Sequence, residues 1–243
     1  MSERATLMRL RDVNVNIGES HILQGVSFDV PAGGVTGLLG RNGVGKTTTL
    51  RGILGILPRT GSVTLAGDEL TRLPTHEIVR RGVAYVPEDR EVFGSLTVAE
   101  NLRLAEREGS AEPRYDLVYD LFPELKERRK QKAGTLSGGQ QQMVAIARVL
   151  LSENRILLID EPTKGLSPLL VNKVVEVLRR AAEVATILLV EQNLSVAHAL
   201  ARDAIVLDQG RVTYTGSVGE LMGDPALARR YLGLSGPGAH AAS

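Results

Sequence analysis

The segment from residue 40 to residue 47, GRNGVGKT, has the residue types and spacing of a phosphate-binding loop. Its glycines allow the backbone to curl so that N–H groups point at phosphate oxygens. Lys46 is expected to reach the β and γ phosphates, and Thr47 to place its hydroxyl on Mg²⁺. A chance glycine-rich turn is the alternative. The apolar run before the loop and the helical spacing after it favour a nucleoside triphosphate site. The residues expected to contact the nucleotide are Gly40, Arg41, Asn42, Gly43, Val44, Gly45, Lys46, Thr47 and Thr48.

An acidic pair follows a second apolar run, RILLIDEPT at 155–163. Asp160 is placed at the carboxyl end of a buried strand, where parallel α/β sheets bind their ligands, and is expected to hold Mg²⁺ through water. Glu161 points the other way in the strand alternation and could accept a proton from the attacking water. The alternative is an acidic cap on a strand-to-turn junction before Pro162. The phosphate loop in the same chain favours the catalytic interpretation.

A second anion site is predicted at LSGGQ, residues 136–140. Ser137, Gly138 and Gly139 open a helical run with free backbone N–H groups, and Gln140 completes the segment. An isolated capped turn is the alternative. One chain cannot easily bring this segment onto its own nucleotide, so two anion sites in one sequence suggest that two chains act together.

The elements that must position these residues predict an α/β fold. The patterns at 7–17 and 25–30 indicate antiparallel strands, and the run at 35–40 predicts a strand before a helix at 46–57. Further short apolar runs that alternate with helical stretches indicate parallel strands joined by crossovers. The expected architecture is therefore an α/β core with an N-terminal antiparallel β layer, and the family resemblance described below implies that this core is a P-loop NTPase of the RecA-like type.

Residues 98–153 carry helical patterns with no convincing strand between them, which indicates an inserted helical lobe. We expect one domain, 1–243, in which 1–87 and 154–233 form the nucleotide-binding core with its β layer. A helical lobe is expected at 88–153 and a flexible tail at 234–243.

Composition excludes several classes of function. The chain of 243 residues has 29 basic and 28 acidic side chains, so nothing in its net charge favours nucleic acid as a partner. The basic run KERRKQK at 126–132 lacks interleaved aromatic residues and is expected to be a solvated surface. The absence of cysteine excludes disulfides and agrees with a reducing compartment. No apolar run approaches the roughly 20 residues that span a bilayer.

These motifs together resemble the ATP-binding subunits of ABC transporters, over about residues 6–233. The order is the phosphate loop, the region after VAYVP, LSGGQ, IDEP and a final strand, TILLVEQN. The resemblance implies that two subunits pack head to tail, as a homodimer or a heterodimer. Each ATP would then lie between the phosphate loop of one subunit and Ser137, Gly138, Gly139 and Gln140 of the other.

More narrowly, VAYVPEDREVFGSLTVAENL, EPTKGLSP and LLVEQN resemble the second ATPase subunit of branched-chain amino-acid importers, whose near relatives carry urea or short amides. The implied function is ATP hydrolysis that drives import of branched-chain or other hydrophobic amino acids. The implied partners are a second ATPase subunit, two membrane permeases and a periplasmic or lipid-anchored substrate-binding protein. The implied location is the cytoplasmic face of the cell membrane, as a peripheral protein. The alternatives are an ATPase of a urea or amide importer and an ABC-type ATPase not coupled to transport.

The sequence departs from the common family pattern at four positions. Glu88 stands where many relatives have a glutamine that senses Mg²⁺; a carboxylate can still hold the metal, and a helix-start acid is the alternative. Ile17 replaces the aromatic residue that stacks on adenine, so base stacking should be weaker. Ser167 replaces an aspartate, with an effect that the sequence does not define.

The fourth departure is Gln192, which stands where the wider family has a histidine that bonds the γ-phosphate. Glutamine keeps a neutral donor amide but does not titrate near pH 7. We expect Gln192 to contact the γ-phosphate. Its neighbours Glu191 and Asn193 are expected to face solvent or to cap the helix that begins near Leu194.

Overall fold

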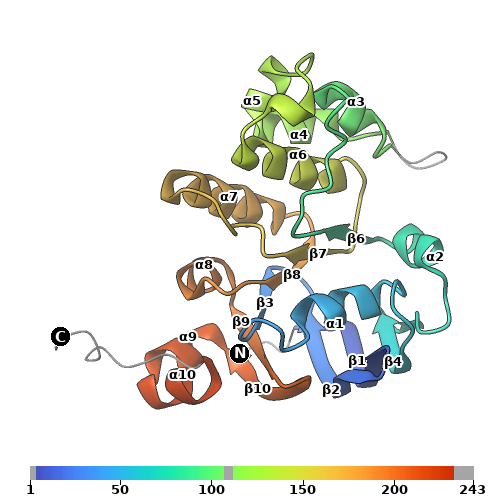
Figure 1. Cartoon of the computed structure of the whole chain (residues 1–243), viewed down its shortest axis with the longest axis vertical. Helices are drawn as coiled ribbons and strands as arrows, with labels where there is room; N and C mark the ends of the chain where they lie inside the picture. Colours follow the sequence, from blue (N-terminus) through green and yellow to red (C-terminus); the bar gives the residue numbers. More distant parts are fainter. Residues whose placement is uncertain (1–3, 107–111, 233–243) are drawn as a thin grey trace.

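The computed structural model describes residues 4–106 and 112–232. Its larger sheet has the strand order β10-β9-β3-β8-β7-β6, in which all neighbours are parallel except the antiparallel edge strand β10 (Figure 1). These strands are β3 (Val35–Leu39), β6 (Val83–Val86), β7 (Ile156–Asp160), β8 (Thr186–Val190), β9 (Asp203–Asp208) and β10 (Arg211–Ser217). The predicted α/β class is confirmed.

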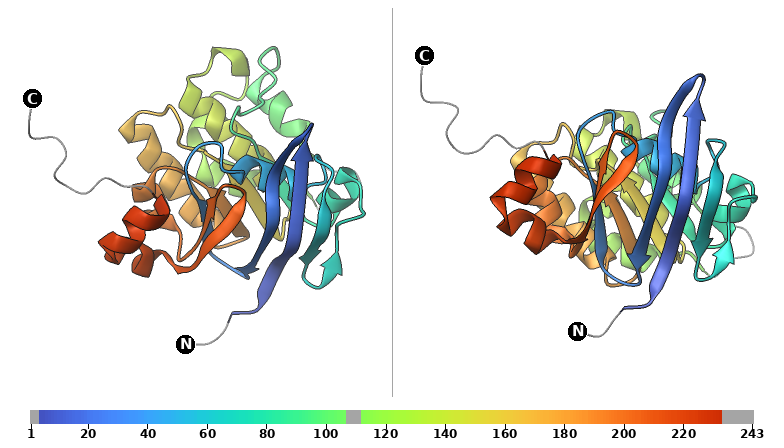
Figure 2. Two further views of the ribbon diagram at one scale, coloured as in Figure 1. Left: turned by 60° about the horizontal axis from the view of Figure 1, so that its bottom comes forward. Right: turned by 90° about the horizontal axis from the view of Figure 1, so that it is seen from below.

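The smaller sheet is antiparallel, with the order β2-β1-β4-β5. Its strands are β1 (Thr6–Ile17), β2 (Ser20–Pro31), β4 (Thr60–Leu65) and β5 (Asp68–Glu69). The long hairpin of β1 and β2 is seen along its length in Figure 2. This confirms the antiparallel N-terminal layer, and it adds β4, whose pairing with β1 the sequence pattern did not specify.

Helices cover both faces of the larger sheet. The helices are α1 (Lys46–Ile53), α2 (Thr75–Arg80), α3 (Val98–Arg103), α4 (Tyr115–Leu121), α5 (Pro123–Glu127), α6 (Gly138–Leu150), α7 (Pro168–Ala181), α8 (Leu194–Leu200), α9 (Val218–Gly223) and α10 (Pro225–Leu232), with a 3₁₀ turn at Ala133–Thr135. The run from α3 to α6 lies between β6 and β7, where helices without strands were predicted. Helix α1 ends at Ile53, earlier than the predicted Leu57, because Gly55 follows with a φ of 69°.

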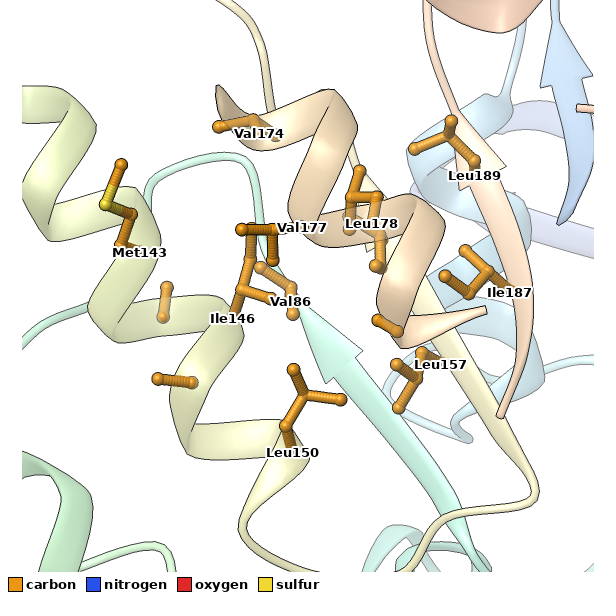
Figure 3. Packing of buried hydrophobic residues seen from close by; sticks show 14 of the residues in the cluster. Val86, Met143, Ile146, Leu150, Leu157, Val174, Val177, Leu178, Ile187 and Leu189 are labelled. Carbon is orange, nitrogen blue, oxygen red and sulfur yellow. The ribbon is translucent and has the colours of Figure 1, made fainter. Parts of the chain in front are cut away.

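Strand alternation divides the hydrophobic core between the two faces of the sheet. Leu157 and Ile187 belong to a cluster with α6 and α7, whose side chains interdigitate with the strands in Figure 3. Leu158 and Leu188 point to the other face and pack with α1 and the antiparallel sheet. Because both faces are covered, β7 and β8 are buried throughout, which explains their unbroken apolar sequences.

Within the described residues, no helix combines the length and the apolar character that crossing a bilayer requires. The basic run at 126–132 is mostly exposed, as predicted. The tail expected at 234–243 lies outside the described residues.

Candidate nucleotide-binding site

The phosphate loop connects β3 to α1, and its glycines adopt conformations that other residues rarely reach. Gly40 has a φ of 143°, and a Cβ on it would lie 2.3 Å from the backbone oxygen of Leu207. Gly45 has a φ of 109° and is the N-cap of α1, so its freedom allows the chain to turn into the helix. The first turn of α1 has no acidic residue, which leaves its N-terminus open to an anion.

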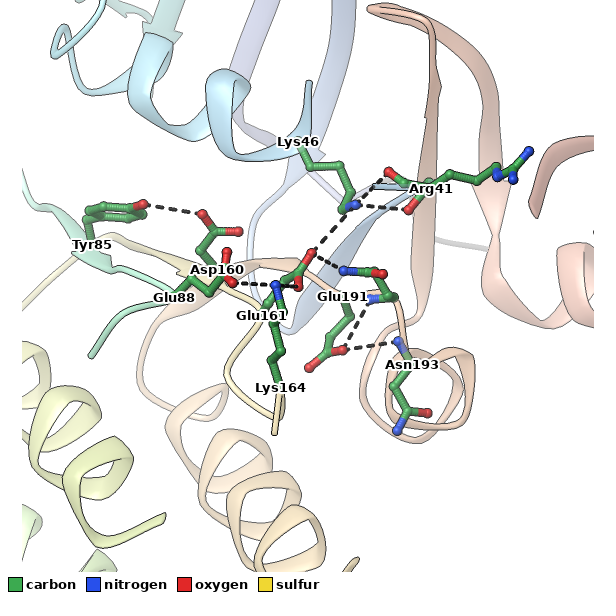
Figure 4. A network of polar contacts seen from close by, with 11 residues as sticks. Arg41, Lys46, Tyr85, Glu88, Asp160, Glu161, Lys164, Glu191 and Asn193 are labelled. Carbon is green, nitrogen blue, oxygen red and sulfur yellow. Dashed lines mark hydrogen bonds and ion pairs between the residues drawn. The ribbon is translucent and has the colours of Figure 1, made fainter. Parts of the chain in front are cut away.

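Lys46 begins α1 and is only 5% exposed. Its Nζ donates to the carbonyl oxygens of Gly40 and Arg41, at 2.9 Å each, and lies 3.6 Å from Oε1 of Glu161 (Figure 4). Burial lowers the pKa of Lys46, and the neighbouring Glu161 opposes that effect. The ammonium group is therefore held over the loop in a largely desolvated position, where an anion gains most from it.

Asp160 ends β7 and has no solvent exposure. The hydroxyl of Tyr85 on β6 donates to its Oδ2 at 3.3 Å, whereas Oδ1 is buried without a hydrogen-bond partner. Burial raises the pKa of Asp160; Thr47 opposes this effect, and the charge of Glu161 adds to it. A buried carboxylate oxygen without a donor is a suitable ligand for a cation.

The position of Glu161 corrects the prediction that strand alternation directs its side chain. Glu161 lies just beyond β7 and has a φ of 44°, in the left-handed region that non-glycine residues rarely occupy. This backbone turn directs the carboxylate toward the phosphate loop, where it meets Lys46. Such strain is common at functional sites, where the surrounding structure holds it in place.

Glu88 follows β6 and forms an ion pair with Lys164, at 2.5 Å between Oε1 and Nζ. The same ammonium lies 3.6 Å from Oε2 of Glu161. The hydrogen bond to Glu88 and the charges of both carboxylates raise the pKa of Lys164. The structure thus brings Glu88 near Asp160 and Glu161, as predicted, and adds Lys164, whose role the sequence did not suggest (Figure 4).

The three polar residues after β8 have different surroundings. Gln192 donates from Nε2 to Oε1 of Glu161 at 2.6 Å. Asn193 caps α8 by accepting the backbone N–H groups of Ser195 and Val196, which confirms its predicted alternative role. Glu191 is 3% exposed, so the prediction that it faces solvent or caps the helix is wrong. Its carboxylate turns inward because Thr163 and two backbone N–H groups compensate its loss of water.

The LSGGQ segment forms the N-terminus of α6. Ser137 and Gln140 make a capping box, in which each side chain accepts the other's backbone N–H. A Cβ on Gly138 would lie 2.9 Å from Nη1 of Arg90, and one on Gly139 would lie 2.6 Å from Cδ1 of Leu170. In Figure 1, α6 lies on the opposite side of the larger sheet from α1, so one chain does not unite the two predicted anion sites.

The remaining departures from the family pattern also have defined places. Ile17 ends β1 with 49% of its surface exposed, and Ser167 occupies the N-cap of α7 without a side-chain capping bond. A hollow of about 540 Å³ opens between the phosphate loop and the residues after β8, within the roughly 300–1,000 Å³ typical of small-molecule sites. It is lined by Gly40, Arg41, Asn42, Val44, Glu191, Gln192, Leu194 and Asp208.

Two contacts in this region, Thr163 with Glu191 and Lys164 with Glu88, do not follow from the sequence. Thr163 and Glu191 lie 28 positions apart, and no spacing rule connects them. Lys164 could have been suspected from its place three residues after Glu161, but its partner Glu88 is 76 positions away. Both links depend on the adjacent carboxyl ends of β6, β7 and β8.

The fold and the loop together define a protein with the P-loop NTPase fold. The backbone superimposes on a nucleotide-free ATP-binding cassette of an ABC transporter with a TM-score of 0.80, covering 95% of this chain and 100% of that one at 24% identity, which shows the fold.

Sequence comparison narrows this class to a family. The ABC transporter family profile matches residues 23–164. The high-affinity branched-chain amino acid transport ATP-binding protein BraG of Pseudomonas aeruginosa is 40% identical over 226 residues, covering 91% of this chain and 97% of that protein. A probable branched-chain amino acid transport ATP-binding protein, LivF of Archaeoglobus fulgidus, is 39% identical, covering 93% and 99%. The chain belongs to the ABC transporter family and is an ATP-hydrolysing, transport-coupled ATPase.

Proposed function

We propose that this chain is the ATPase subunit that energises import of branched-chain or other hydrophobic amino acids through a pair of membrane permeases. The observation that carries the proposal is identity of 40% across nearly the whole length of a protein named for branched-chain amino acid transport. The chain acts at the cytoplasmic face of the membrane, attached through the permeases and supplied by a substrate-binding protein.

Within the site, Lys46 and the loop glycines bind the β and γ phosphates of ATP. Glu161 accepts the proton of the attacking water, and Gln192 holds the γ-phosphate or the water against it. The contacts of Glu161 with Lys46 and Gln192 support this assignment, because they place a base, a cation and a donor amide within one small region. Head-to-tail pairing with a second ATPase subunit brings Ser137 and its neighbours onto the partner's nucleotide.

The residues present fit a magnesium ion. Asp160 offers a buried oxygen without a hydrogen-bond partner, and Thr47 and Glu88 are the further oxygen donors that we assign to the ion. Among the described residues, no three His, Cys, Asp or Glu side chains gather around one point. That sparse donor set suits Mg²⁺, which proteins bind through one or two carboxylates together with phosphate oxygens. The ion neutralises phosphate charge when bound.

The permeases dock at a groove near residues 88–102, and an apolar hollow of about 320 Å³ next to this segment supports that placement. Leu54, Val79 and Pro87 line it, and Ile56 at its edge is 51% exposed. Arg148 also lines the hollow, and its guanidinium lies 5.3 Å from the centroid of the exposed ring of Phe93.

Reconstitution tests the proposal. The chain is purified with its permeases in proteoliposomes, and ATP hydrolysis is measured with the binding protein carrying leucine, urea or no solute. Stimulation by leucine supports the proposal. Stimulation by urea alone supports the alternative of a urea or amide importer, and failure to associate with any permease supports an ATPase outside transport. Replacing Glu161 with glutamine should leave ATP binding intact and lower kcat by roughly 100-fold or more, because only the base is lost.

A further inference from the structure

Three hydrogen bonds join the loop after β7 to the end of β8 and the loop that follows it. The backbone N–H of Glu161 donates at 2.9 Å to the oxygen of Val190, the last residue of β8, which pairs with Asp160. Farther out, the hydroxyl of Thr163 donates to Oε1 of Glu191 at 2.7 Å. Between them, Nε2 of Gln192 donates to Oε1 of Glu161 at 2.6 Å. The two loops are therefore linked as a closed ring that contains both the base and the donor amide.

Glu191 contributes a side-chain bond to this ring, and burying its carboxylate there costs free energy. It is 3% exposed, and a buried carboxylate is tolerated only when hydrogen bonds replace its water. Its Oε2 accepts the backbone N–H groups of Gln192 and Asn193, at 3.2 Å each, while Oε1 accepts the hydroxyl of Thr163. Burial raises the pKa of Glu191, and these bonds oppose the effect. One side chain thus holds the backbone of its own loop, after β8, and a side chain of the loop after β7.

We propose that Glu191 and Thr163 form a clasp that positions Gln192 against Glu161, so that ATP hydrolysis depends on two residues that need not touch the nucleotide. The inference rests on the proposed roles of Glu161 and Gln192. Glu191 anchors the backbone N–H of Gln192, and Thr163 lies two residues beyond Glu161, so the clasp sets the spacing between base and amide from both sides.

The geometry explains why the clasp matters for rate more than for binding. Lys46 begins α1 and the loop glycines lie between β3 and α1, so none of them belongs to the ring, and we expect phosphate binding to survive the loss of the clasp. The alignment of Glu161 and Gln192 does depend on it, and a displacement of about 1 Å at a reacting group can cost roughly 100-fold in rate.

The test is steady-state hydrolysis of Mg-ATP by the full chain. Thr163→Val removes the hydroxyl at nearly constant volume, and Thr163→Ser is the matched control that keeps it. We expect kcat of the valine variant to fall about 10-fold, with KM within about 2-fold of wild type, and the serine variant to stay within about 3-fold in kcat. Glu191→Ala removes the acceptor of the Thr163 hydroxyl together with that of the two backbone N–H groups, so its kcat should fall at least as far as that of Thr163→Val. The double variant should be no slower than Glu191→Ala, because the contact with Thr163 is already lost there.

Wild-type kcat in either Thr163→Val or Glu191→Ala overturns the clasp, as does a fall in kcat matched by a rise in KM, or a double variant whose losses multiply. The two variants remove the contact from opposite sides, so one that folds and binds ATP is sufficient. Glu161→Gln in the same assay distinguishes failure of the clasp from failure of the proposed role of Glu161. If it is inactive while the clasp variants are normal, only the clasp fails; if it is fully active, the proposed role of Glu161 fails.

Discussion

Replacing Asp160 with asparagine should stabilise the nucleotide-free protein and abolish its response to magnesium. The carboxylate is completely buried, and Oδ1 has no hydrogen-bond partner. Burial raises its pKa above the value in the unfolded chain. Ionisation therefore lowers the free energy of unfolding as the pH rises from the unfolded to the folded pKa, and the loss is complete above the folded pKa. Asparagine removes this loss.

The size of the effect follows from the contacts of the side chain. An unsatisfied buried polar group costs about 1–3 kcal/mol. Asparagine keeps an acceptor for the hydroxyl of Tyr85 and replaces an unpartnered anionic oxygen with a neutral amide, so we expect recovery of about 1 kcal/mol. In a chain of 243 residues, this corresponds to a rise in Tm of about 2–4 °C.

Thermal unfolding in EDTA, with ATP alone, and with ATP and Mg²⁺ provides the assay. Saturation at about 100 times Kd stabilises a protein by about 2.7 kcal/mol, so the wild type should gain several degrees from Mg-ATP. The variant should gain only what ATP gives without the metal. A lower Tm of the variant in EDTA would show that the carboxylate stabilises the empty site, and a full magnesium-dependent gain would show that Asp160 does not bind the ion.

Three further predictions concern neighbouring residues. Gln192→Ala should lower kcat more than it weakens ATP binding, whereas Gln192→His should keep activity, and an inactive histidine variant would count against a hydrogen-bonding role. Lys164→Gln should change kcat by less than about 3-fold, because exposed ion pairs contribute little; a loss comparable to that of Glu161→Gln would place the ammonium in the chemistry. Ile17→Tyr should lower the KM for ATP about 2- to 10-fold by restoring a stacking ring, measured with GTP as the competing substrate. An unchanged KM would show that the base does not bind at position 17.

Much of the fold could be predicted because its signals are local. The unbroken apolar runs of β7 and β8 indicate strands covered on both faces, and Ser137 with the following glycines indicates a helix start. The partner of β4 could not be predicted, since strand pairing depends on contacts between distant segments. The end of α1 was placed too late, because the apolar spacing continues beyond the glycine that stops the helix.

In the candidate site, too, residues that belong to a local motif could be predicted, whereas contacts between distant segments could not. Lys46 and Asp160 were found from their motifs, because each must follow a strand at a fixed offset. The direction of Glu161 was attributed to strand alternation, whereas a left-handed backbone conformation sets it. Glu191 is predicted to face solvent or to cap the helix near Leu194, whereas it is buried, because another loop supplies its partner Thr163.

The residue types and their spacing along the chain were sufficient to predict the phosphate loop, the acidic pair, the glutamine at position 192 and a second anion site at LSGGQ. These motifs could be predicted because the residues of each segment determine its own backbone conformation. Only the tertiary structure decided which partners Glu191 and Lys164 have. Their partners become neighbours when β6, β7 and β8 align in parallel and end at one edge, and the energy of a buried or bridged charge depends on those neighbours rather than on sequence position.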